Sequence, residues 1–274
     1  MRKRRAAAAV AAVLVIALAG AWWFMSGGSP DREPAAWLTA QDAAHRGQWT
    51  AGPARPENSL AAFREAAGNG YAVELDVQLS RDGRLVVFHD YELSRMTTST
   101  GDVADRTLTE LQELSLLGGS ETIPTLREAL DTVGGRVPVF VEIKNEGEVG
   151  RLENAVAREV SAYDGPAAIM SFNPFSLARV AQAAPEVPRG QLAGALRDED
   201  LALHEVVLLS NLLMNWKSRP DFIAYELTEL PNVGTTLQKW RGRPLLGWTA
   251  DSPAERGAGR SRCDAVICNP GALR

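Results

Sequence analysis

Cysteine is almost absent from this chain, with only Cys263 and Cys268 among 274 residues. Cys263 directly precedes a predicted strand and Cys268 ends it, so an extended chain would place their Cα atoms about 16 Å apart at about 3.3 Å per residue. A disulfide needs Cα atoms within about 7 Å of each other. We therefore expect no disulfide and a fold that depends on a large hydrophobic core, which a content of 45% apolar residues permits.

An excess of positive charge is also lacking. The chain has 29 Lys and Arg against 34 Asp and Glu, and four of the basic residues lie within the first five positions. The remainder carries 25 basic and 34 acidic side chains, a formal charge of −9. Nucleic-acid binding depends on basic side chains that neutralise phosphates, so we expect no nucleic-acid partner. No feature of the sequence implies a protein partner.

Several familiar signatures are missing as well. The sequence has no glycine-rich phosphate loop, no serine nucleophile elbow, no zinc-type ligand spacing and no internal repeat. These absences argue against P-loop nucleotide binding, serine hydrolysis, a structural zinc site and a solenoid.

What is present first is a long apolar run at the N-terminus. The basic residues Arg2 to Arg5 precede about twenty uncharged residues that end at Met25. As a helix this run would span about 30 Å, the thickness of a bilayer core. We predict a membrane anchor over residues 1–25, a single transmembrane helix with the rest of the chain on the extracytoplasmic side. A cleavable signal peptide is the alternative, because Ala17-Leu18-Ala19 resembles a cleavage site.

Residues 26–36 are predicted to be a flexible linker, and residues 37–274 the folded domain. Within this domain apolar runs of strand length alternate with helical patterns in eight units, which favours an α/β fold of the closed (β/α)8 TIM barrel type over an open sheet. A polar, Thr-rich passage at about 91–119 is too long for an ordinary connection and is predicted to be a small insertion after the second strand. The expected barrel strands cover residues 41–44, 73–79, 136–144, 167–170, 189–192, 221–225, 244–248 and 264–268.

Charged residues interrupt the apolar pattern of the second strand. Glu74 and Asp76 alternate with apolar residues, so both carboxylates lie on one face of an extended chain, about 7 Å apart. A following apolar run ends at His89. The solvated face of a half-exposed strand would also explain the two carboxylates. However, polar or aromatic residues recur where other predicted strands end, and catalytic groups of barrel enzymes lie at these ends. These residues include His45, Glu142, Lys144 and Trp248.

Several spaced motifs together resemble the glycerophosphodiester phosphodiesterase family. The resemblance covers nearly everything after the linker and implies a (β/α)8 barrel with an insertion after the second strand and one divalent metal ion. It also implies hydrolysis of a small-molecule glycerophosphodiester to glycerol 3-phosphate and an alcohol. The motifs are HRG at 45–47, PENS at 56–59, ELDVQLSRDGRLVVFHD at 74–90, LSRMT at 93–97, IPTL at 123–126, VEIK at 141–144, SF at 171–172 and WT at 248–249.

By motif position, the resemblance implies a role for eight residues. The implied roles are metal ligand for Glu74, Asp76 and Glu142, acid/base catalyst for His45 and His89, phosphate binding for Arg46 and Lys144, and a lining of the glycerol pocket for Trp248. One position departs from the pattern. Where the family usually has Thr-Asp-x-Pro after the last strand, this chain has Cys268-Asn269-Pro270, so Asn269 keeps a polar side chain but loses the charge.

The chemistry of phosphodiester hydrolysis matches this set of residues. A catalyst needs positive charge on the phosphoryl oxygens and a proton for the leaving group. Three carboxylates suit a hard cation, Ca²⁺ or Mg²⁺, better than zinc. One histidine can deprotonate the nucleophile while the other protonates the departing oxygen. The nucleophile is either water or the neighbouring hydroxyl of the substrate, which would give a cyclic phosphate.

Two other functions are compatible with the same sequence. A barrel phospholipase of the phosphatidylinositol-specific or sphingomyelinase D kind would act on intact or lyso lipids, and a membrane anchor would suit it. An inactive barrel that binds lipid or sugar phosphates is a second alternative, motivated by Asn269. Comparing lipids with deacylated diesters as substrates would separate the first alternative from the expected enzyme, and metal-independent binding without turnover would indicate the second.

Overall fold

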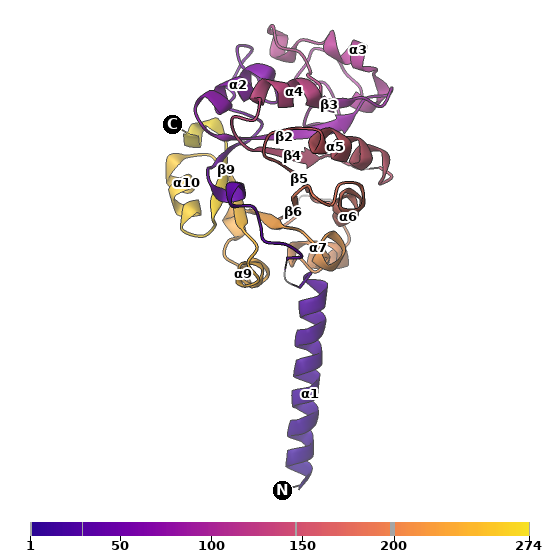
Figure 1. Cartoon of the computed structure of the whole chain (residues 1–274), viewed down its shortest axis with the longest axis vertical. Coiled ribbons are helices and arrows are strands. Elements are labelled where there is room, and N and C mark those ends of the chain that lie inside the picture. The colour runs from indigo at the N-terminus through magenta and orange to yellow at the C-terminus, as the bar shows by residue number, and fades with distance from the viewer. Residues whose placement is uncertain (1, 29, 146, 198–200, 274) are drawn as a thin grey trace.

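The computed structural model describes residues 2–28, 30–145, 147–197 and 201–273. Within these ranges eight parallel strands form a closed barrel, because β1 pairs with both β2 and β9 (Figure 1). This closure confirms the predicted (β/α)8 barrel. The barrel strands are β1 (Ala43–Ala44), β2 (Ala72–Leu79), β4 (Val139–Ile143), β5 (Ala167–Ser171), β6 (Arg189–Ala193), β7 (Phe222–Glu226), β8 (Leu245–Ala250) and β9 (Ala265–Cys268).

Helices surround the barrel and connect its strands (Figure 1). Several begin at a side chain that accepts a hydrogen bond from the first turn, as Ser59 does for α2 and Thr125 for α4. The helix expected over residues 201–214 is shorter than predicted: α7 ends at Ser210, and a turn over residues 211–214 leads to the separate helix α8. The helices are α2 (Leu60–Gly68), α4 (Leu126–Val133), α5 (Arg151–Ser161), α6 (Pro174–Ala183), α7 (Leu203–Ser210), α8 (Asn215–Ser218), α9 (Val233–Trp240) and α10 (Pro253–Arg260).

The barrel strands are buried on both faces. One apolar cluster, which includes Phe140 and Phe222, fills the interior of the barrel. A larger cluster, which includes Phe63 and Val141, lies between the sheet and the helices. Because apolar residues on β2 point outward to the helices, its alternating polar residues point into the barrel. The alternation read from the sequence therefore sends charge inward instead of toward solvent.

The segment after β2 is an excursion from the barrel. The short strand β3 (Leu85–Val87) pairs antiparallel with β2, and the predicted insertion follows it. A third apolar cluster, which includes Phe88 and Leu111, holds this region together. The helix α3 (Leu108–Gln112) is shorter than the expected helix over 108–117, and Leu117 has a left-handed φ of 49° within a separate turn.

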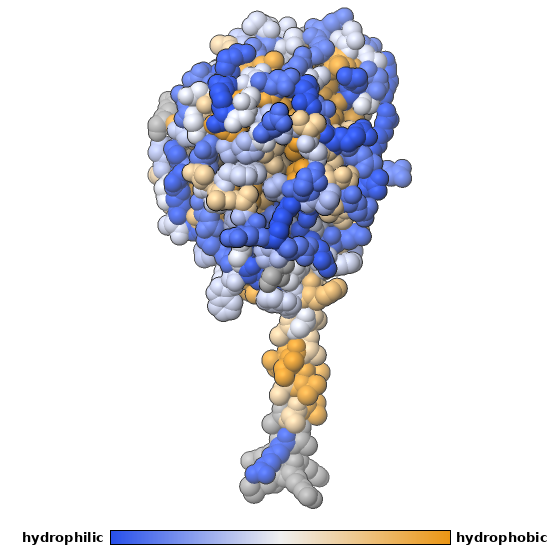
Figure 2. Space-filling view, viewed as in Figure 1, coloured by the Kyte–Doolittle hydropathy of each residue, from blue (hydrophilic) through white to orange (hydrophobic). Residues whose placement is uncertain are grey.

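The helix α1 (Arg2–Met25) projects from the barrel domain as a single rod (Figure 1). Its apolar side chains are exposed along the rod (Figure 2), as Ile16 at 71% and Leu18 at 69% illustrate. Among the described residues, no helix combines the length and the apolar character needed to cross a membrane. The structure therefore does not support the transmembrane helix predicted over residues 1–25.

The residues between α1 and the barrel make defined contacts with the barrel domain. Arg243 is 2% exposed and donates hydrogen bonds to the carbonyl oxygens of Gly27 (3.1 Å) and Gly28 (2.6 Å). Arg32 pairs with Asp221 through two hydrogen bonds of 2.8 Å. The boundaries that we gave to the anchor, linker and barrel remain predictions.

Candidate active site

The candidate site lies at the carboxyl ends of β1, β2 and β4. His45 follows β1 directly, and its backbone N–H donates to the carbonyl of Cys268 on β9 at 2.9 Å. Asp76 on β2 and Glu142 on β4 are register partners, and Glu74 lies two residues before Asp76 on the same inward face. The strand register thus brings together the three carboxylates that the sequence suggested as ligands.

The three carboxylates form a compact, buried cluster. One oxygen from each of Glu74, Asp76 and Glu142 lies within 4.8 Å of the others. Their exposed fractions are 1%, 1% and 8%, which excludes the solvated strand face as an explanation. The Oδ1 atom of Asp76 is buried and has no hydrogen-bond partner within the described residues. Because hard cations prefer oxygen ligands, this donor set fits one Ca²⁺ or Mg²⁺ ion.

Burial and charge act strongly on these carboxyl groups. Burial, followed by the charges of Asp76 and Glu142, raises the pKa of Glu74 well above its ordinary value. Burial likewise raises the pKa of Glu142, although Lys144 opposes this shift. For Asp76 burial opposes ionisation, but Lys144 and neighbouring groups outweigh it and lower the pKa to about 2. Burial therefore disfavours the ionised forms of Glu74 and Glu142, and a bound cation would favour them.

Two basic side chains border the carboxylates. The Nη1 atom of Arg46 donates to Glu57 at 2.9 Å, and its Nε lies 3.5 Å from Asp76 Oδ2. The Nζ atom of Lys144 donates to Glu142 at 2.8 Å and lies 3.6 Å from Asp76 Oδ1. Both cations therefore lie where they could contact a phosphate bound beside the carboxylate cluster.

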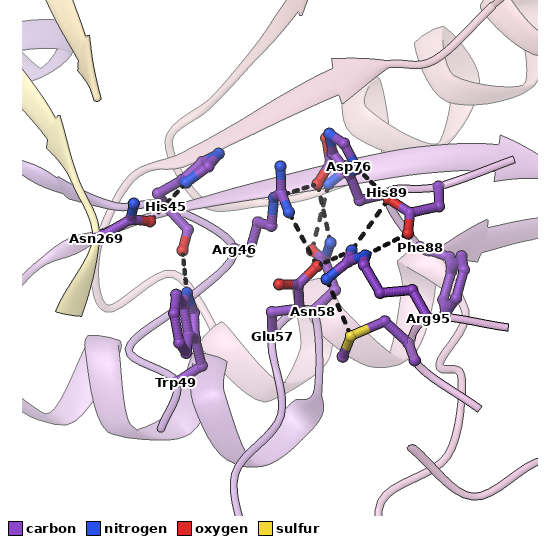
Figure 3. A network of polar contacts seen from close by, with 12 residues as sticks. His45, Arg46, Trp49, Glu57, Asn58, Asp76, Phe88, His89, Arg95 and Asn269 are labelled. Atoms are coloured by element: carbon purple, nitrogen blue, oxygen red, sulfur yellow. Dashed lines mark hydrogen bonds and ion pairs between the residues drawn. The ribbon is translucent and has the colours of Figure 1, made fainter. Parts of the chain in front are cut away.

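His89 reaches the site from the loop after β3 (Figure 3). The Nε2 of Gln78 fixes this loop by donating to the carbonyl oxygens of Phe88 (2.9 Å), His89 (3.2 Å) and Asp90 (2.7 Å). The ring Nδ1 of His89 lies 2.6 Å from Asp90 Oδ1, and Nε2 lies 3.1 Å from Lys144 Nζ. The carboxylate accepts at Nδ1, so Nε2 is the ring nitrogen directed at the site.

His45 lies on the other side of Arg46 from His89 (Figure 3). Its Nδ1 is 2.8 Å from Oδ1 of Asn269. Burial, followed by the positive charge of Arg46, lowers the pKa of His45 to about 4. The imidazole is thus neutral at neutral pH, and its partner is a neutral amide at the position where the sequence departs from the expected acid.

Asn58 is a site residue whose role the sequence did not reveal. We expected Asn58 or Ser59 to cap α2, and Ser59 is the cap. The side chain of Asn58 instead donates to Asp76 Oδ2 at 2.9 Å, and its backbone N–H donates to the carbonyl of Arg46 at 2.9 Å. Asn58 has a left-handed φ of 56°, a conformation that Asn tolerates better than most residues. The sequence offered two signals, the PENS motif and an Asn before a helix, but the second is equally typical of a cap and the first gave no role to Asn58.

A second missed feature links the insertion to the site (Figure 3). Arg95 donates to Glu57 at 2.6 Å and to both carboxylate oxygens of Asp90. Glu57 in turn accepts from Arg46, and Asp90 from His89. Arg95 therefore links Glu57, the partner of Arg46, to Asp90, the partner of His89. Its place in the LSRMT motif was noted in the sequence, but these contacts were not.

Trp248 lies at the same end of the barrel but apart from the carboxylates. It is on β8, and its ring packs edge to face against Phe172 with centroids 5.6 Å apart. Its indole Nε1 is buried and has no hydrogen-bond partner in the described part of the chain. No described hydrogen bond or ion pair joins Trp248 to the other site residues. A ligand that extends from the cluster could contact its ring and accept from Nε1.

Known proteins share both the sequence and the fold. The sequence profile of the glycerophosphoryl diester phosphodiesterase family matches residues 45–269. A glycerophosphodiester phosphodiesterase of Caldanaerobacter subterraneus is 37% identical over 170 residues, which cover 54% of this chain and 70% of that protein. Human glycerophosphodiester phosphodiesterase 1 is 27% identical over 232 residues, which cover 73% of this chain and 70% of that protein.

A solved structure extends the comparison to three dimensions. The structure of an Oleispira antarctica phosphodiesterase, in complex with the product sn-glycerol-3-phosphate, superposes with a TM-score of 0.72 at 27% identity. The match covers 86% of this chain and 95% of that one. The match begins directly after β1, covers the other seven barrel strands and includes every candidate site residue. The chain therefore belongs to the glycerophosphoryl diester phosphodiesterase family and is an enzyme of that class.

Proposed function

We propose that this enzyme hydrolyses glycerophosphodiesters to sn-glycerol 3-phosphate and an alcohol, with His45 and His89 as its acid/base pair. The observation that carries the proposal is that the carboxylate cluster, two histidines and the basic side chains of Arg46 and Lys144 converge at one end of the barrel. The Oleispira antarctica relative, whose structure contains sn-glycerol-3-phosphate, supports the identity of the product.

The different partners of the two histidines suggest which of them is the base. His45 has a neutral partner at Nδ1 and a pKa lowered to about 4, so its Nε2 can take a proton from the nucleophile at neutral pH. His89 has the Asp90 carboxylate at Nδ1, an acceptor that would stabilise the ring once Nε2 takes up a proton, and Nε2 lies 3.1 Å from the Lys144 ammonium. We assign the base to His45 and the acid that protonates the leaving alcohol to His89.

A divalent cation is part of the proposal. Glu74, Asp76 and Glu142 would hold it, and when bound it would supply positive charge to the phosphoryl oxygens. The choice of Ca²⁺ or Mg²⁺ rests on the all-oxygen donor set alone. Arg46 and Lys144 would orient the phosphate, and the Trp248 ring would contact the glycerol carbons.

Turnover on a defined panel of substrates tests this function. Purified full-length protein with Ca²⁺ or Mg²⁺ should release glycerol 3-phosphate from glycerophosphocholine, glycerophosphoethanolamine or glycerophosphoglycerol. Phosphatidylinositol, sphingomyelin and lysophosphatidylcholine should be poor substrates by comparison. Preferred turnover of a lipid would establish the phospholipase alternative instead, and no turnover of any diester would overturn the proposal. Phosphorus NMR would detect a cyclic phosphate if the substrate's own hydroxyl attacks.

The location of the enzyme is a separate part of the proposal. We propose that the barrel lies on the extracytoplasmic side, because the basic residues Arg2 to Arg5 precede an uncharged run, a pattern typical of export signals. A reporter fused to the C-terminus that works only outside the cytoplasm should be active. Activity of a cytoplasmic reporter instead would overturn this location.

A further inference from the structure

Three neighbouring strand ends carry a chain of hydrogen bonds at the mouth of the barrel. β9 pairs with β8 on one side and with β1 on the other. Asp251 follows β8, Asn269 follows β9 and His45 follows β1. The Nδ2 of Asn269 donates to Asp251 Oδ1 at 2.6 Å, while its Oδ1 lies 2.8 Å from His45 Nδ1. The contact between Asn269 and His45 is visible in Figure 3.

The chemistry of these groups permits only one arrangement of hydrogens. An ionised carboxylate can only accept, so the amide NH₂ of Asn269 must face Asp251 and the amide oxygen must face His45. The amide oxygen also only accepts, so Nδ1 of His45 must carry a proton. In the neutral ring Nε2 then holds the free lone pair. This is the nitrogen that must be unprotonated for His45 to act as a base.

Two backbone hydrogen bonds hold Asn269 in place. Its N–H donates to the carbonyl of Ala250 at 2.8 Å, and its carbonyl accepts from Ala272 at 2.9 Å. What remains free is the rotation of the side-chain amide. Its two ends differ, one being an oxygen and the other an NH₂ group, whereas the two oxygens of an Asp carboxylate are equivalent. An amide turned by 180° would offer NH₂ to His45 and favour the opposite tautomer.

We propose that Asp251 is a positioning residue that holds the amide of Asn269 in one orientation and thereby holds His45 in the tautomer with Nδ1 protonated. The effect on catalysis rests on the proposed base role of His45. A carboxylate at position 269 would accept from Nδ1 with either oxygen and would need no such support. It would also repel Asp251, so Asn269 and Asp251 are matched to each other.

Nitrogen NMR tests the tautomer without relying on activity. The chain has only three histidines, so His45 can be assigned by comparison with a His45→Gln variant. In the native protein labelled with ¹⁵N-histidine, Nδ1 of His45 should give the protonated signal and Nε2 the unprotonated one. In Asp251→Ala the two signals should move toward a mixture of tautomers. A native ring protonated at Nε2 would overturn the proposal, whatever the catalytic activity.

The consequence for catalysis is tested by introducing Asp251→Ala both into the native protein and into the Asn269→Asp variant. Asp251→Ala should lower kcat by roughly fivefold, the equivalent of one hydrogen bond, with KM nearly unchanged. Asp251→Asn keeps an acceptor oxygen and should recover most of this loss. In the Asn269→Asp background, Asp251→Ala should leave kcat unchanged or raise it, because a repulsion is removed.

The control is Glu148→Ala, which removes an exposed carboxylate from the loop after β4 and should leave kcat unchanged in both backgrounds. Thermal unfolding should show that each variant is folded at the assay temperature. An equal loss of kcat from Asp251→Ala in both backgrounds would mean a merely structural role and would contradict the proposal. No loss in either background would contradict it as well.

Discussion

At the scale of single residues, substitution of a proposed metal ligand and substitution of a proposed acid/base histidine should change metal affinity and turnover differently. Glu142→Gln removes one ligand charge from the cluster, so it should weaken metal affinity and lower turnover together. His89→Ala removes an acid/base group while the carboxylates remain, so kcat should fall by about 10²–10⁴ with metal affinity retained. Calorimetry of Ca²⁺ and Mg²⁺ binding beside turnover separates the two. Unchanged metal affinity in Glu142→Gln would remove Glu142 from the metal site.

His45 should also impose a pH dependence on stability. Its pKa is lowered from 6.5 to about 4 in the folded protein, so the unfolded chain binds the proton more readily between these values. The stability linked to His45 is therefore present above pH 6.5 and lost as the pH falls through 4, up to about 3 kcal/mol. Urea unfolding of the metal-free protein between pH 7 and 4 should show this loss.

Two variants show whether this pH dependence of stability belongs to His45. His45→Gln should lack this part of the pH dependence, whereas His204→Gln, which changes an exposed histidine on α7, should keep it. Parallel pH profiles for the native protein and His45→Gln would show that burial does not act on His45 as inferred.

At the scale of elements, the connection between α1 and the barrel depends on buried Arg243. Its guanidinium donates to the carbonyl oxygens of Gly27, Gly28 and Pro220, and burial lowers its pKa to about 10. Arg243→Ala leaves these carbonyl groups without their donor, so we expect a loss of about 3 kcal/mol and faster proteolysis between α1 and the barrel.

Arg219→Ala is the matched control for this element. Arg219 pairs with Asp31 in the same connection, but the two side chains are 61% and 60% exposed. Exposed ion pairs contribute little, so the loss should stay below about 1 kcal/mol. Equal losses in Arg219→Ala and Arg243→Ala, measured by urea unfolding, would show that burial of the arginine is not what stabilises the connection.

At the scale of the whole molecule, the metal should be needed for activity but not for folding. The barrel is closed by strand pairing and filled by its own apolar clusters, neither of which involves the carboxylates. A chelator should therefore abolish turnover and leave the far-UV circular dichroism spectrum unchanged, and Ca²⁺ or Mg²⁺ should restore activity. Full activity of the chelated enzyme would rule out the metal site.

The stabilising effect of the metal should grow with pH. Burial raises the pKa of Glu74 and Glu142 in the metal-free fold, so their contribution to stability is present below their unfolded pKa values and lost as the pH rises through the raised values. A bound cation reverses this, because it favours the ionised carboxylates. The rise in Tm on adding metal should be larger at pH 8 than at pH 5, and an equal rise at both would contradict the raised pKa values.

The sequence by itself determined the class of fold, and its motifs pointed to most of the residues that the structure brings together in the candidate site. Strand-length apolar runs that alternate with helical patterns require a parallel sheet covered by helices, and eight of them fit a closed barrel. The alternation around Glu74 and Asp76 fixed their common face, since side-chain direction follows from a period of two. Local pattern was sufficient here because both properties belong to the strand itself.

Only the tertiary structure decided what those residues contact. Burial of Asp76 and its contact with Asn58, the link through Arg95, and the approach of Asp251 to Asn269 all join segments distant in the chain. No local pattern encodes such contacts, because they depend on the register between strands and on how the loops fold over the barrel mouth. The same holds for the pKa values of the site, which follow from burial and from charges that the closed barrel brings together.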